Sequence, residues 1–525
     1  MNFYLPTTWK APTATKPLKY LRVDCVTNPH SQKNQTTLWR KNLHHYLGLD
    51  DPDLRYRRTQ TPVNYSPSEL INGHLLLCGM SGTGKSFQAL RLLNSAAKSG
   101  LALDVFDVHD ELSDVTGSVA CTFSQHTQYG INPLALNSDK HTGGVDTQIN
   151  FLISLVRENT AQFGSKQEAA LRYLLRDVYA TFGIYQNKPS TWHRKNITEA
   201  TRLRLIETND LTTLHRNHYP TMSDLLDYTR RKIITLTVGG DNPSMGLFDA
   251  LSKQRRKLHR LLKTWDTTAA KLTGSSGHIE TENGADCPIE TLRSKIGETS
   301  AACKQAFCDF IDSLETGRET DDILKYDSSQ TLTSVLHRLT LITGSGIFSA
   351  TPAPFDKNRP RIHQLKSIST AQQVMYVKLR LQAIFDQCKR NGRTDGNRLR
   401  HVIFLDEAHK YFSSDPDDII NVISKEARKF GLALWCASQE PTSFPESFLT
   451  NCGTTLLLGI HTSYWKKAAA MFRITEETLS SIRPKEVMSI KTLRDGEIDP
   501  PFRNIIVPNQ TTKAGRIAHQ HQQGA

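Results

Sequence analysis

Short apolar runs alternate with amphipathic stretches along much of the chain. Runs of mostly apolar residues predict buried strands, because strands of a parallel sheet are covered on both faces. A helical pattern follows the first run, since Phe87, Leu90, Leu93 and Ala97 recur at helical spacing before Gly100. This order predicts an α/β fold with a mostly parallel sheet. The expected strands lie at 75–78, 101–108, 361–368, 402–405, 432–436 and 454–460.

The pattern becomes mostly helical between residue 146 and about residue 344. We therefore expect a helical domain inserted into the α/β core, with a flexible loop at the Gly/Ser-rich stretch 273–284. The expected organisation is an N-terminal arm or small flanking module at 1–68, the first half of the core at 69–145, the inserted helical domain at 146–344, the second half of the core at 345–510 and a disordered tail at 511–525.

The first apolar run leads into a phosphate-binding loop of the form G-x-x-x-x-G-K-S. Its glycines let backbone N–H groups turn inward around phosphate oxygens. Lys85 is expected to reach the β- and γ-phosphates and Ser86 to place its hydroxyl on Mg²⁺. ATP and Mg²⁺ are therefore the expected cofactors. The loop consists of Gly79, Met80, Ser81, Gly82, Thr83, Gly84, Lys85 and Ser86.

A second element supplies two carboxylates at the end of the run 402–405. In P-loop enzymes the first acid holds the Mg²⁺ shell and the second orients or deprotonates the attacking water, so we assign these roles to Asp406 and Glu407. Asp406 to His409 also spells the DEAH box of a helicase group. The other motifs of that group are missing or in the wrong order, so we set that interpretation aside.

Composition narrows the class of partner. Lys and Arg number 65 against 52 Asp and Glu, a formal net charge of +13 that favours a polyanion, and nucleic acid ranks before membrane. No apolar run approaches the roughly 20 residues that a membrane helix needs, and the first 20 residues lack the layout of a secretory signal. We expect a cytoplasmic protein without an integral membrane segment. Its nine cysteines fit reduced thiols.

The segment 426–441 carries a resemblance to a known family. Arg428-Lys429-Phe430-Gly431 leads into an apolar run that ends in Ser438-Gln439-Glu440-Pro441. This resembles the HerA/FtsK superfamily of ring-forming, DNA-pumping ATPases, in which an Arg-Lys-aromatic-Gly turn precedes a strand ending in Ser/Thr-Gln-x-Pro. The resemblance implies a RecA-like P-loop NTPase core and assembly into a ring, with a hexamer as the expected form.

Two further segments add to the resemblance. Residues 107–111 are similar to the D-x-H-G-E element of the HerA branch, with Asp110 in place of glycine, which marks Asp107, His109 and Glu111 as auxiliary site residues. The insertion, with its flanks at 130–134 and 344–348, looks more like the type IV secretion ATPases of conjugation systems. A nuclease or a secretion or conjugation protein is therefore an expected partner.

Helical spacing gives Arg428 a candidate role, and a place at the end of the next expected strand gives one to Gln439. Ile419, Ile420, Ile423, Ala427 and Phe430 form one apolar stripe, which predicts that Asn421, Ser424, Lys425 and Arg428 lie on the opposite face. In a ring, Arg428 is then expected to reach the γ-phosphate held by the neighbouring subunit as an arginine finger, or it is a solvated cation at a helix end. Gln439 is expected to contact the γ-phosphate and the attacking water, unless it is an ordinary polar residue at a strand end.

The densest basic segment, 253–263, includes Arg255, Arg256 and Arg260 as candidate DNA contacts, although its leucines also fit a charged helix face in a bundle. Together these patterns predict a ring-forming DNA translocase or helicase-type motor driven by ATP hydrolysis. A conjugation or type IV secretion ATPase is the alternative within the superfamily. An ATP-gated interaction or switch module with slow turnover is the alternative of another class, and the intact acidic pair argues against it.

Overall fold

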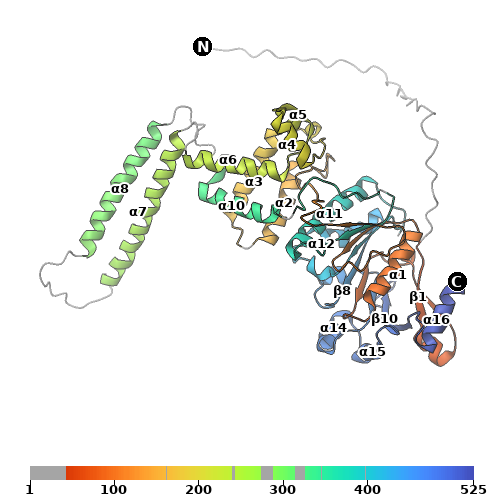
Figure 1. Ribbon diagram of the computed structural model, residues 1–525. Coiled ribbons are helices and arrows are strands. Elements are labelled where there is room, and N and C mark those ends of the chain that lie inside the picture. Colours follow the sequence, from red (N-terminus) through yellow and green to blue (C-terminus); the bar gives the residue numbers. More distant parts are fainter. Residues whose placement is uncertain are drawn as a thin grey trace, which may run out of the picture. The chain divides into compact units, whose positions relative to one another are not determined.

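The strands that the structure describes form one sheet (Figure 1). The computed structural model describes residues 43–160, 162–238, 243–273, 288–313, 325–344, 346–356, 358–396 and 398–524. The strand order across the sheet is β2-β1-β11-β10-β9-β3-β8-β7-β4-β6-β5. The strands are β1 His45–Asp50, β2 Pro62–Tyr65, β3 Leu75–Cys78, β4 Ala102–Asp107, β5 Val119–Thr122, β6 Arg361–Gln364, β7 His401–Leu405, β8 Leu432–Ser438, β9 Thr454–Leu457, β10 Val487–Thr492 and β11 Arg503–Ile506.

The stretch from β9 to β5 is parallel, as the apolar runs predict, and the strands from β10 to β2 are antiparallel. Successive side chains of a strand point to opposite faces, and β3 is buried on both. Leu75 and Leu77 belong to the apolar cluster that includes Leu92 of α1 (Lys85–Lys98), whereas Leu76 and Cys78 belong to a second cluster with the inserted helices. The P-loop strand is therefore held from both sides.

The remaining helices cover the sheet or belong to the insertion. Those of the core after the insertion are α11 Thr370–Arg390, α12 Ile419–Glu426, α13 Glu446–Leu449, α14 Trp465–Phe472, α15 Glu476–Ser481 and α16 Lys513–Gly524. The insertion contains α2 Val145–Asn159, α3 Ser165–Thr181, α4 Glu199–Glu207, α5 Leu211–Asn217, α6 Met222–Val238, α7 Pro243–Thr273, α8 Pro288–Asp312 and α10 Ser329–Thr343.

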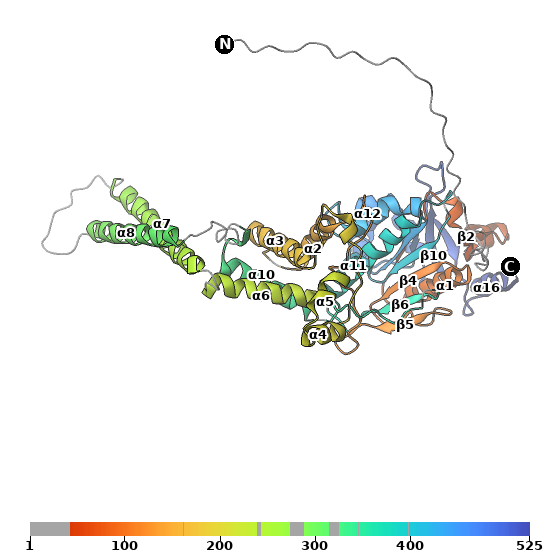
Figure 2. The same cartoon turned by 90° about the horizontal axis from the view of Figure 1, so that it is seen from above.

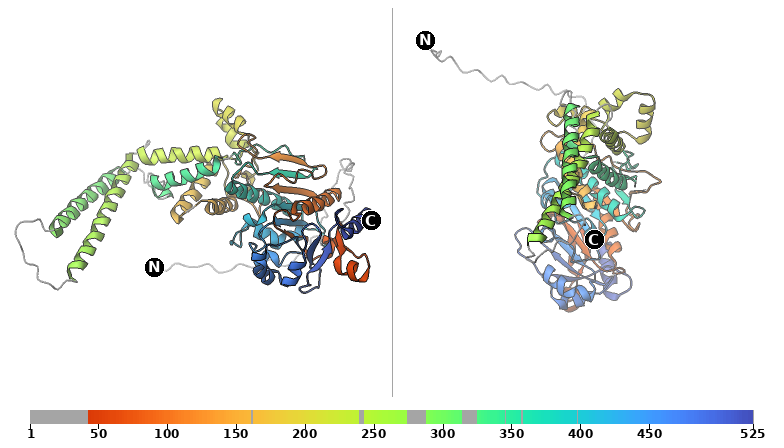
Figure 3. Two further views of the ribbon diagram at one scale, coloured as in Figure 1. Left: turned by 60° about the horizontal axis from the view of Figure 1, so that its bottom comes forward. Right: turned by 90° about the vertical axis from the view of Figure 1, so that its left-hand side faces the viewer.

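The insertion leaves the sheet after β5 and returns to it at β6, and these two strands are parallel neighbours at one edge (Figure 2). Helices α2, α3, α6 and α10 pack on one another, and α7 and α8 run side by side as a long pair (Figure 3). The predicted flexible loop lies largely outside the described residues. In the described part of the chain, no helix is both long enough and apolar enough to cross a bilayer.

The prediction of an arm or small flanking module at 1–68 is wrong for residues 43–68, because β1 and β2 join the sheet of the core. Tyr65 is fully buried, and the Trp435 indole N–H of β8 donates to its hydroxyl at 3.0 Å. The alternating pattern of β1 is interrupted at Gly48, where the register shifts and a Cβ would lie 2.2 Å from the Ile506 carbonyl oxygen. This irregularity hides the strand from a periodicity argument. Residues 1–42 lie outside the described part.

The expected disordered tail is also wrong, because α16 covers residues 513–524. Ala518 is fully buried against Leu49 and Ile506, so the helix packs on β1 and β11. The His521 ring stacks on Tyr46 with ring centroids 5.4 Å apart. The segment is polar overall, yet a few small and apolar side chains at helical spacing suffice once a sheet face is available to them.

His74 links two strands of the core, and its burial predicts a pH dependence of stability. Its Nδ1 accepts the Leu434 N–H at 2.9 Å, and burial lowers its pKa to about 4. Since an unfolded histidine titrates near 6.5, the unfolded state binds more protons between pH 6.5 and 4. The free energy of unfolding should therefore fall as the pH drops through this window, by up to about 3 kcal/mol from this group, and level off below it.

The measurement is the thermal unfolding midpoint against pH for wild type and His74→Gln. The variant should show a smaller fall of the midpoint between pH 6.5 and 4, because it lacks the contribution of His74. His126→Gln, which removes an exposed histidine, serves as the control and should keep the wild-type slope. Equal slopes in all three proteins would contradict the assignment.

Candidate functional site

The P-loop has the backbone that its glycines allow. Gly82 and Gly84 have φ of 78° and 98°, which side-chain-bearing residues rarely adopt. A Cβ on Gly79 would lie 2.5 Å from Thr83 Oγ1, so only glycine permits this close turn. The loop is tied at two points, because the Thr83 hydroxyl donates to the Met80 carbonyl at 2.7 Å and the Met80 N–H donates to the Gly459 carbonyl after β9 at 3.0 Å.

Helix α1 begins at Lys85, directly after this loop. The first N–H groups of a helix lack intrahelical partners and carry the positive end of its dipole, so they form an anion site with the loop. Ser81 and Gly82 are exposed at the tip, and Phe87 is 55% exposed beside it. The phosphate-binding face is therefore open to solvent on one side.

Lys85 and Glu407 meet at the centre of the site. The Lys85 Nζ lies 2.8 Å from Glu407 Oε1, and the two side chains are only 10% and 4% exposed. Glu407 follows β7 with a φ of 47°, a left-handed conformation that costs a non-glycine residue about 1 kcal/mol or more. Such outliers persist where the surroundings over-determine them, and they gather at functional sites.

Gln439 follows β8 and completes this contact. Its Nε2 donates to Glu407 Oε1 at 2.9 Å, so side chains from three distant segments converge on one carboxylate. Burial acts to raise the pKa of Glu407, but the hydrogen bonds and charges of Lys85 and its neighbours outweigh it and lower that pKa. The carboxylate is therefore ionised at neutral pH.

His409 is a neighbour that the sequence argument did not assign. Its Nδ1 lies 2.9 Å from Ser438 Oγ and 3.4 Å from Glu407 Oε2, and burial lowers its pKa. Its place in the Asp-Glu-Ala-His tetrapeptide was the one sequence feature that pointed to His409. In the structure His409 contacts Glu407 and Ser438, which does not depend on any relation to the DEAH-box helicases.

The metal-binding candidates lie beside this carboxylate. Asp406 is buried, and burial, with Glu407 and Asp107 nearby, raises its pKa to about 6. The Ser86 hydroxyl donates to Glu111 Oε2 at 2.5 Å. Lys85, Ser86, Glu111 and Asp406 all line a hollow of only about 10 Å³. Hydroxyl and carboxylate oxygens are the donor set that Mg²⁺ prefers.

In the described residues no group of three or more His, Cys, Asp or Glu side chains is arranged to hold a metal ion by itself. Mg²⁺ is usually bound through one or two protein ligands together with substrate phosphates and water. The oxygens of Ser86 and Asp406, which line the same hollow, therefore fit a magnesium ion that arrives with a nucleotide.

The element at 107–111 divides into two kinds of residue. Asp107 is fully buried, and its carboxylate accepts the N–H groups of His109, Asp110 and Leu112 at 3.1, 2.9 and 2.8 Å, so it shapes the loop. Asp110, which replaces the family's glycine, keeps a glycine-like φ of 62°. His109 faces the site, with its Nε2 3.8 Å from Glu407 Oε1 and 4.0 Å from Asp406 Oδ2.

Arg428 is exposed on the short 3₁₀ turn η6 (Ala427–Phe430) that follows α12. Four residues of the apolar stripe are buried as predicted and Phe430 is half-buried, but Asn421 and Ser424 are buried as well, which corrects the expected polar face. Asn421 Nδ2 donates to the carbonyls of Ser413 and Asp415, and the Ser424 hydroxyl donates to the Asn421 carbonyl. These polar side chains satisfy local backbone groups and do not face solvent.

Helix α12 is also tied to the insertion. Asp418 caps its N-terminus by accepting the Ile420 N–H at 3.0 Å, and the same carboxylate pairs with the buried Lys378 of α11. Lys378 pairs in addition with Glu158 in the last turn of α2. One ammonium group thus connects the insertion, α11 and the helix that leads to Arg428.

Arg255, Arg256 and Arg260 are exposed on α7, while the leucines at 251, 258 and 261 are half-buried. Arg256 also donates to Gln330 Oε1 of α10 at 3.3 Å. The helix therefore has both a packing stripe and a basic outer face.

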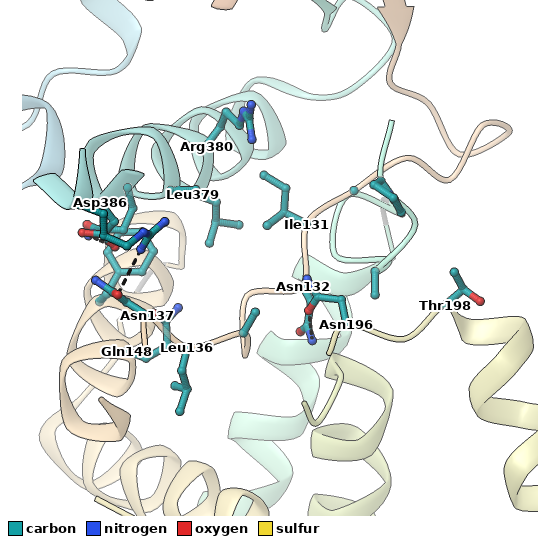
Figure 4. A pocket seen from close by; sticks show the side chains of 18 residues that line it. Ile131, Asn132, Leu136, Asn137, Gln148, Asn196, Thr198, Leu379, Arg380 and Asp386 are labelled. Carbon is teal, nitrogen blue, oxygen red and sulfur yellow. Dashed lines mark hydrogen bonds between the residues drawn. The ribbon is translucent and has the colours of Figure 1, made fainter. Parts of the chain in front are cut away.

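A larger cavity of about 590 Å³ lies away from the P-loop, between α11 and the segments 130–137 and 196–198 of the insertion (Figure 4). Its charged side chains are engaged with protein groups. Asp386 lies 3.0 Å from the Lys389 ammonium, and the Arg390 guanidinium donates to Asn137 at 3.2 Å. The cavity offers no set of groups that selects a particular ligand.

Comparisons with known proteins find a family model and a similar fold. Residues 54–236, which include the P-loop, match the family model described as "Helicase HerA, central domain". The fold is similar to that of VirB4 of Thermoanaerobacter pseudethanolicus, with a TM-score of 0.52 and 15% identity over 89% of this chain and 96% of that chain. The bacterial conjugative coupling protein TrwBdeltaN70, in complex with sulphate, gives a TM-score of 0.44 and 12% identity over 90% and 97%. No curated protein sequence matches the chain.

Proposed function

We propose that this chain, a P-loop ATPase of the HerA/FtsK type, hydrolyses ATP with Mg²⁺ and couples hydrolysis to the movement of DNA through an assembly of several copies of itself. The observation that carries the proposal is the convergence of Lys85, Glu407 and Gln439. Their side chains come from three segments far apart in sequence and meet within hydrogen-bonding distance at the carboxyl ends of adjacent strands. Ligands bind at this edge of open α/β sheets.

The contacts support a division of labour in hydrolysis. Lys85 neutralises Glu407 through their ion pair. Phosphate oxygens of a bound nucleotide would compete for the ammonium group and leave Glu407 free to accept a proton from water. Gln439, already bonded to Glu407, would orient that water. Ser86 and Asp406 would hold Mg²⁺, which supplies positive charge at the phosphate oxygens.

The openness of the site supports an assembly. Ser81, Gly82 and Phe87 of the P-loop and the start of α1 are exposed, so a nucleotide bound to this face would remain open to water on its other side. Closing such a site against water strengthens its electrostatic interactions. A neighbouring copy that supplies Arg428 would both cover the nucleotide and place a cation at the γ-phosphate. A ring, with a hexamer as the expected form, repeats this contact in every copy.

DNA as the transported partner rests on charge. The formal net charge is +13, and the outer face of α7 exposes Arg255, Arg256 and Arg260. Phosphate contacts from such a face are independent of sequence, which suits a motor that moves along DNA. A second candidate is a cytoplasmic conjugation or secretion ATPase with a protein partner. The fold similarity to VirB4, which covers 89% of this chain and 96% of that chain, favours it.

The first prediction separates nucleotide binding from hydrolysis. Lys85→Ala should abolish both, because it removes the main cation facing the phosphates. Glu407→Gln should bind ATP at least as tightly as wild type, since the competing carboxylate is gone, and should hydrolyse it about 10² to 10⁴ times more slowly. Binding of a fluorescent ATP analogue and steady-state turnover measure the two effects. Lys98→Ala, at the exposed far end of α1, is the control. If folded Lys85→Ala protein hydrolyses ATP as fast as wild type, the proposed site is wrong. If the wild-type protein itself hydrolyses ATP only slowly, the result favours the ATP-gated switch module.

The second prediction concerns the interface. Arg428→Ala should bind ATP normally but have a turnover about 10³ times slower, whereas Lys429→Ala on the same turn should not. Mixing Arg428→Ala with Lys85→Ala subunits pairs an intact P-loop with an intact arginine at some interfaces, so activity should partly return. If the mixture stays inactive while wild-type subunits diluted into Arg428→Ala assemblies keep proportionate activity, the role in trans is wrong.

The third prediction tests DNA. The affinity for DNA should fall steeply as the salt concentration rises. Joint replacement of Arg255, Arg256 and Arg260 by Gln should reduce the slope of the logarithm of the binding constant against the logarithm of the salt concentration, by about one for each phosphate that the variant no longer neutralises. The charge-matched control replaces the exposed cations Arg393, Lys466 and Lys513 by Gln. An equal effect of both triple variants would assign binding to net charge alone, and an absence of DNA-stimulated turnover would favour the protein-transport alternative.

A further inference from the structure

The turn that leads into β10 has an unusual backbone. The Glu486 N–H donates to the Arg483 carbonyl at 3.0 Å, which places Pro484 and Lys485 at the two central positions. Lys485 has a φ of 65°. A turn with proline first and a left-handed residue second is type II, and it strongly favours glycine at the second position. A lysine there costs about 1 to 2 kcal/mol of backbone strain.

This turn lies directly against the P-loop. The Lys485 Cγ is 3.6 Å from the place that a Cβ on Gly84 would occupy. Pro484 Cγ is 3.7 Å from the corresponding place on Gly459, whose carbonyl accepts the Met80 N–H at 3.0 Å. The lysine stem therefore passes over the residue where the phosphate-binding loop becomes helix α1. Its ammonium lies three bonds beyond Cγ on a flexible stem.

The position of Lys485 is set by backbone contacts on both sides. Its carbonyl accepts the Asn509 side-chain N–H at 3.3 Å, and the neighbouring Glu486 carbonyl accepts the Val507 N–H at 2.8 Å. Arg483 and Val487 also form a bridge. The turn is thus fastened to the segment after β11, and the strained lysine does not sit on a loose loop.

The charge of Lys485 is not used within the described part of the chain. The side chain is exposed, and no carboxylate of the described residues forms an ion pair with it. Lys85, by contrast, is paired with Glu407. A cation that is held in a costly backbone conformation beside an anion-binding loop suggests a ligand that offsets the strain.

We propose that Lys485 is a second phosphate-binding cation of the nucleotide site, which contacts the polyphosphate of the bound nucleotide alongside Lys85. This rests on the proposed ATP-binding function. Lys485 contributes binding of substrate and transition state alike, because it lies over the loop and not beside Glu407. Its removal should raise KM and leave kcat nearly unchanged.

The test is Lys485→Gly in the full chain. Glycine suits a φ of 65°, so the turn keeps its shape and the thermal midpoint should not fall. The affinities for ATP, ADP and inorganic tripolyphosphate, each measured by displacement of a fluorescent nucleotide, should all fall about tenfold, as expected for one charge-assisted phosphate contact. Lys485→Arg should retain most of the affinity. The matched control is Arg58→Gly, which removes an exposed cation with a φ of 56° next to β2, five strands from β3, and should bind as wild type.

Three outcomes would overturn the inference. The first is wild-type affinities in Lys485→Gly, the second is a weaker affinity for ATP with an unchanged affinity for tripolyphosphate, and the third is an equal reduction of affinity in Arg58→Gly. The second would place Lys485 against the nucleoside. Lys85→Ala in the same assay separates this inference from the proposed function. If Lys85→Ala fails to bind and Lys485→Gly binds as wild type, only the role of Lys485 is wrong. If Lys85→Ala binds ATP as wild type, the nucleotide site itself is wrong.

Discussion

The contact between Lys85 and Glu407 is the interaction on which the site depends, and the register of the sheet makes it. Cys78 at the end of β3 is level with Ser438 of β8, and Leu405 of β7 is level with Cys436 of the same strand. Two residues beyond Leu405, Glu407 therefore reaches the height at which the P-loop begins. A shift of one residue in either ladder would turn each of these side chains to the other face and separate them.

The same pair sets the electrostatics of the site. A buried ammonium and a buried carboxylate each carry a large desolvation cost, which they offset by facing one another. Gln439 and His409 add contacts to the carboxylate from the next strand and from the turn after β7, so its ionised form is well supported. A nucleotide would replace one partner of this pair and would release the other. Glu407 is therefore held in the ionised form that its proposed role as a base requires.

Ion pairs connect the insertion to the helix that precedes Arg428. Lys378 joins the end of α2 to the N-terminus of α12, and α12 leads to the exposed Arg428. Removing one partner of a buried ion pair leaves an uncompensated charge, so these contacts oppose separation of the three elements. The insertion, which leaves the core between two neighbouring strands, is thus linked through ion pairs to the helix that precedes Arg428.

The sequence by itself determined the chemistry that resides in contiguous motifs. Glycines at 79, 82 and 84 followed by Lys85 specify a phosphate loop, because their close contacts and torsions are local. Apolar runs likewise predict the parallel strands, because burial on both faces leaves a local pattern. Periodicity failed where polar side chains are buried by local hydrogen bonds, as at Asn421, and where a strand is interrupted, as at Gly48. It also failed for α16, whose few apolar contacts matter only against a sheet face.

Tertiary structure alone decided which distant residues meet. Glu407 lies 322 positions from Lys85, and nothing in either motif states that β8 separates their strands by a single place in the sheet. Lys485 is further still from the loop that it covers, and its position depends on the pairing of β10 with β9 and β11. Strand order follows from how the whole chain buries its apolar surface. Periodicity reports whether a segment is buried and leaves its neighbours open, so convergence at the site had to come from the fold.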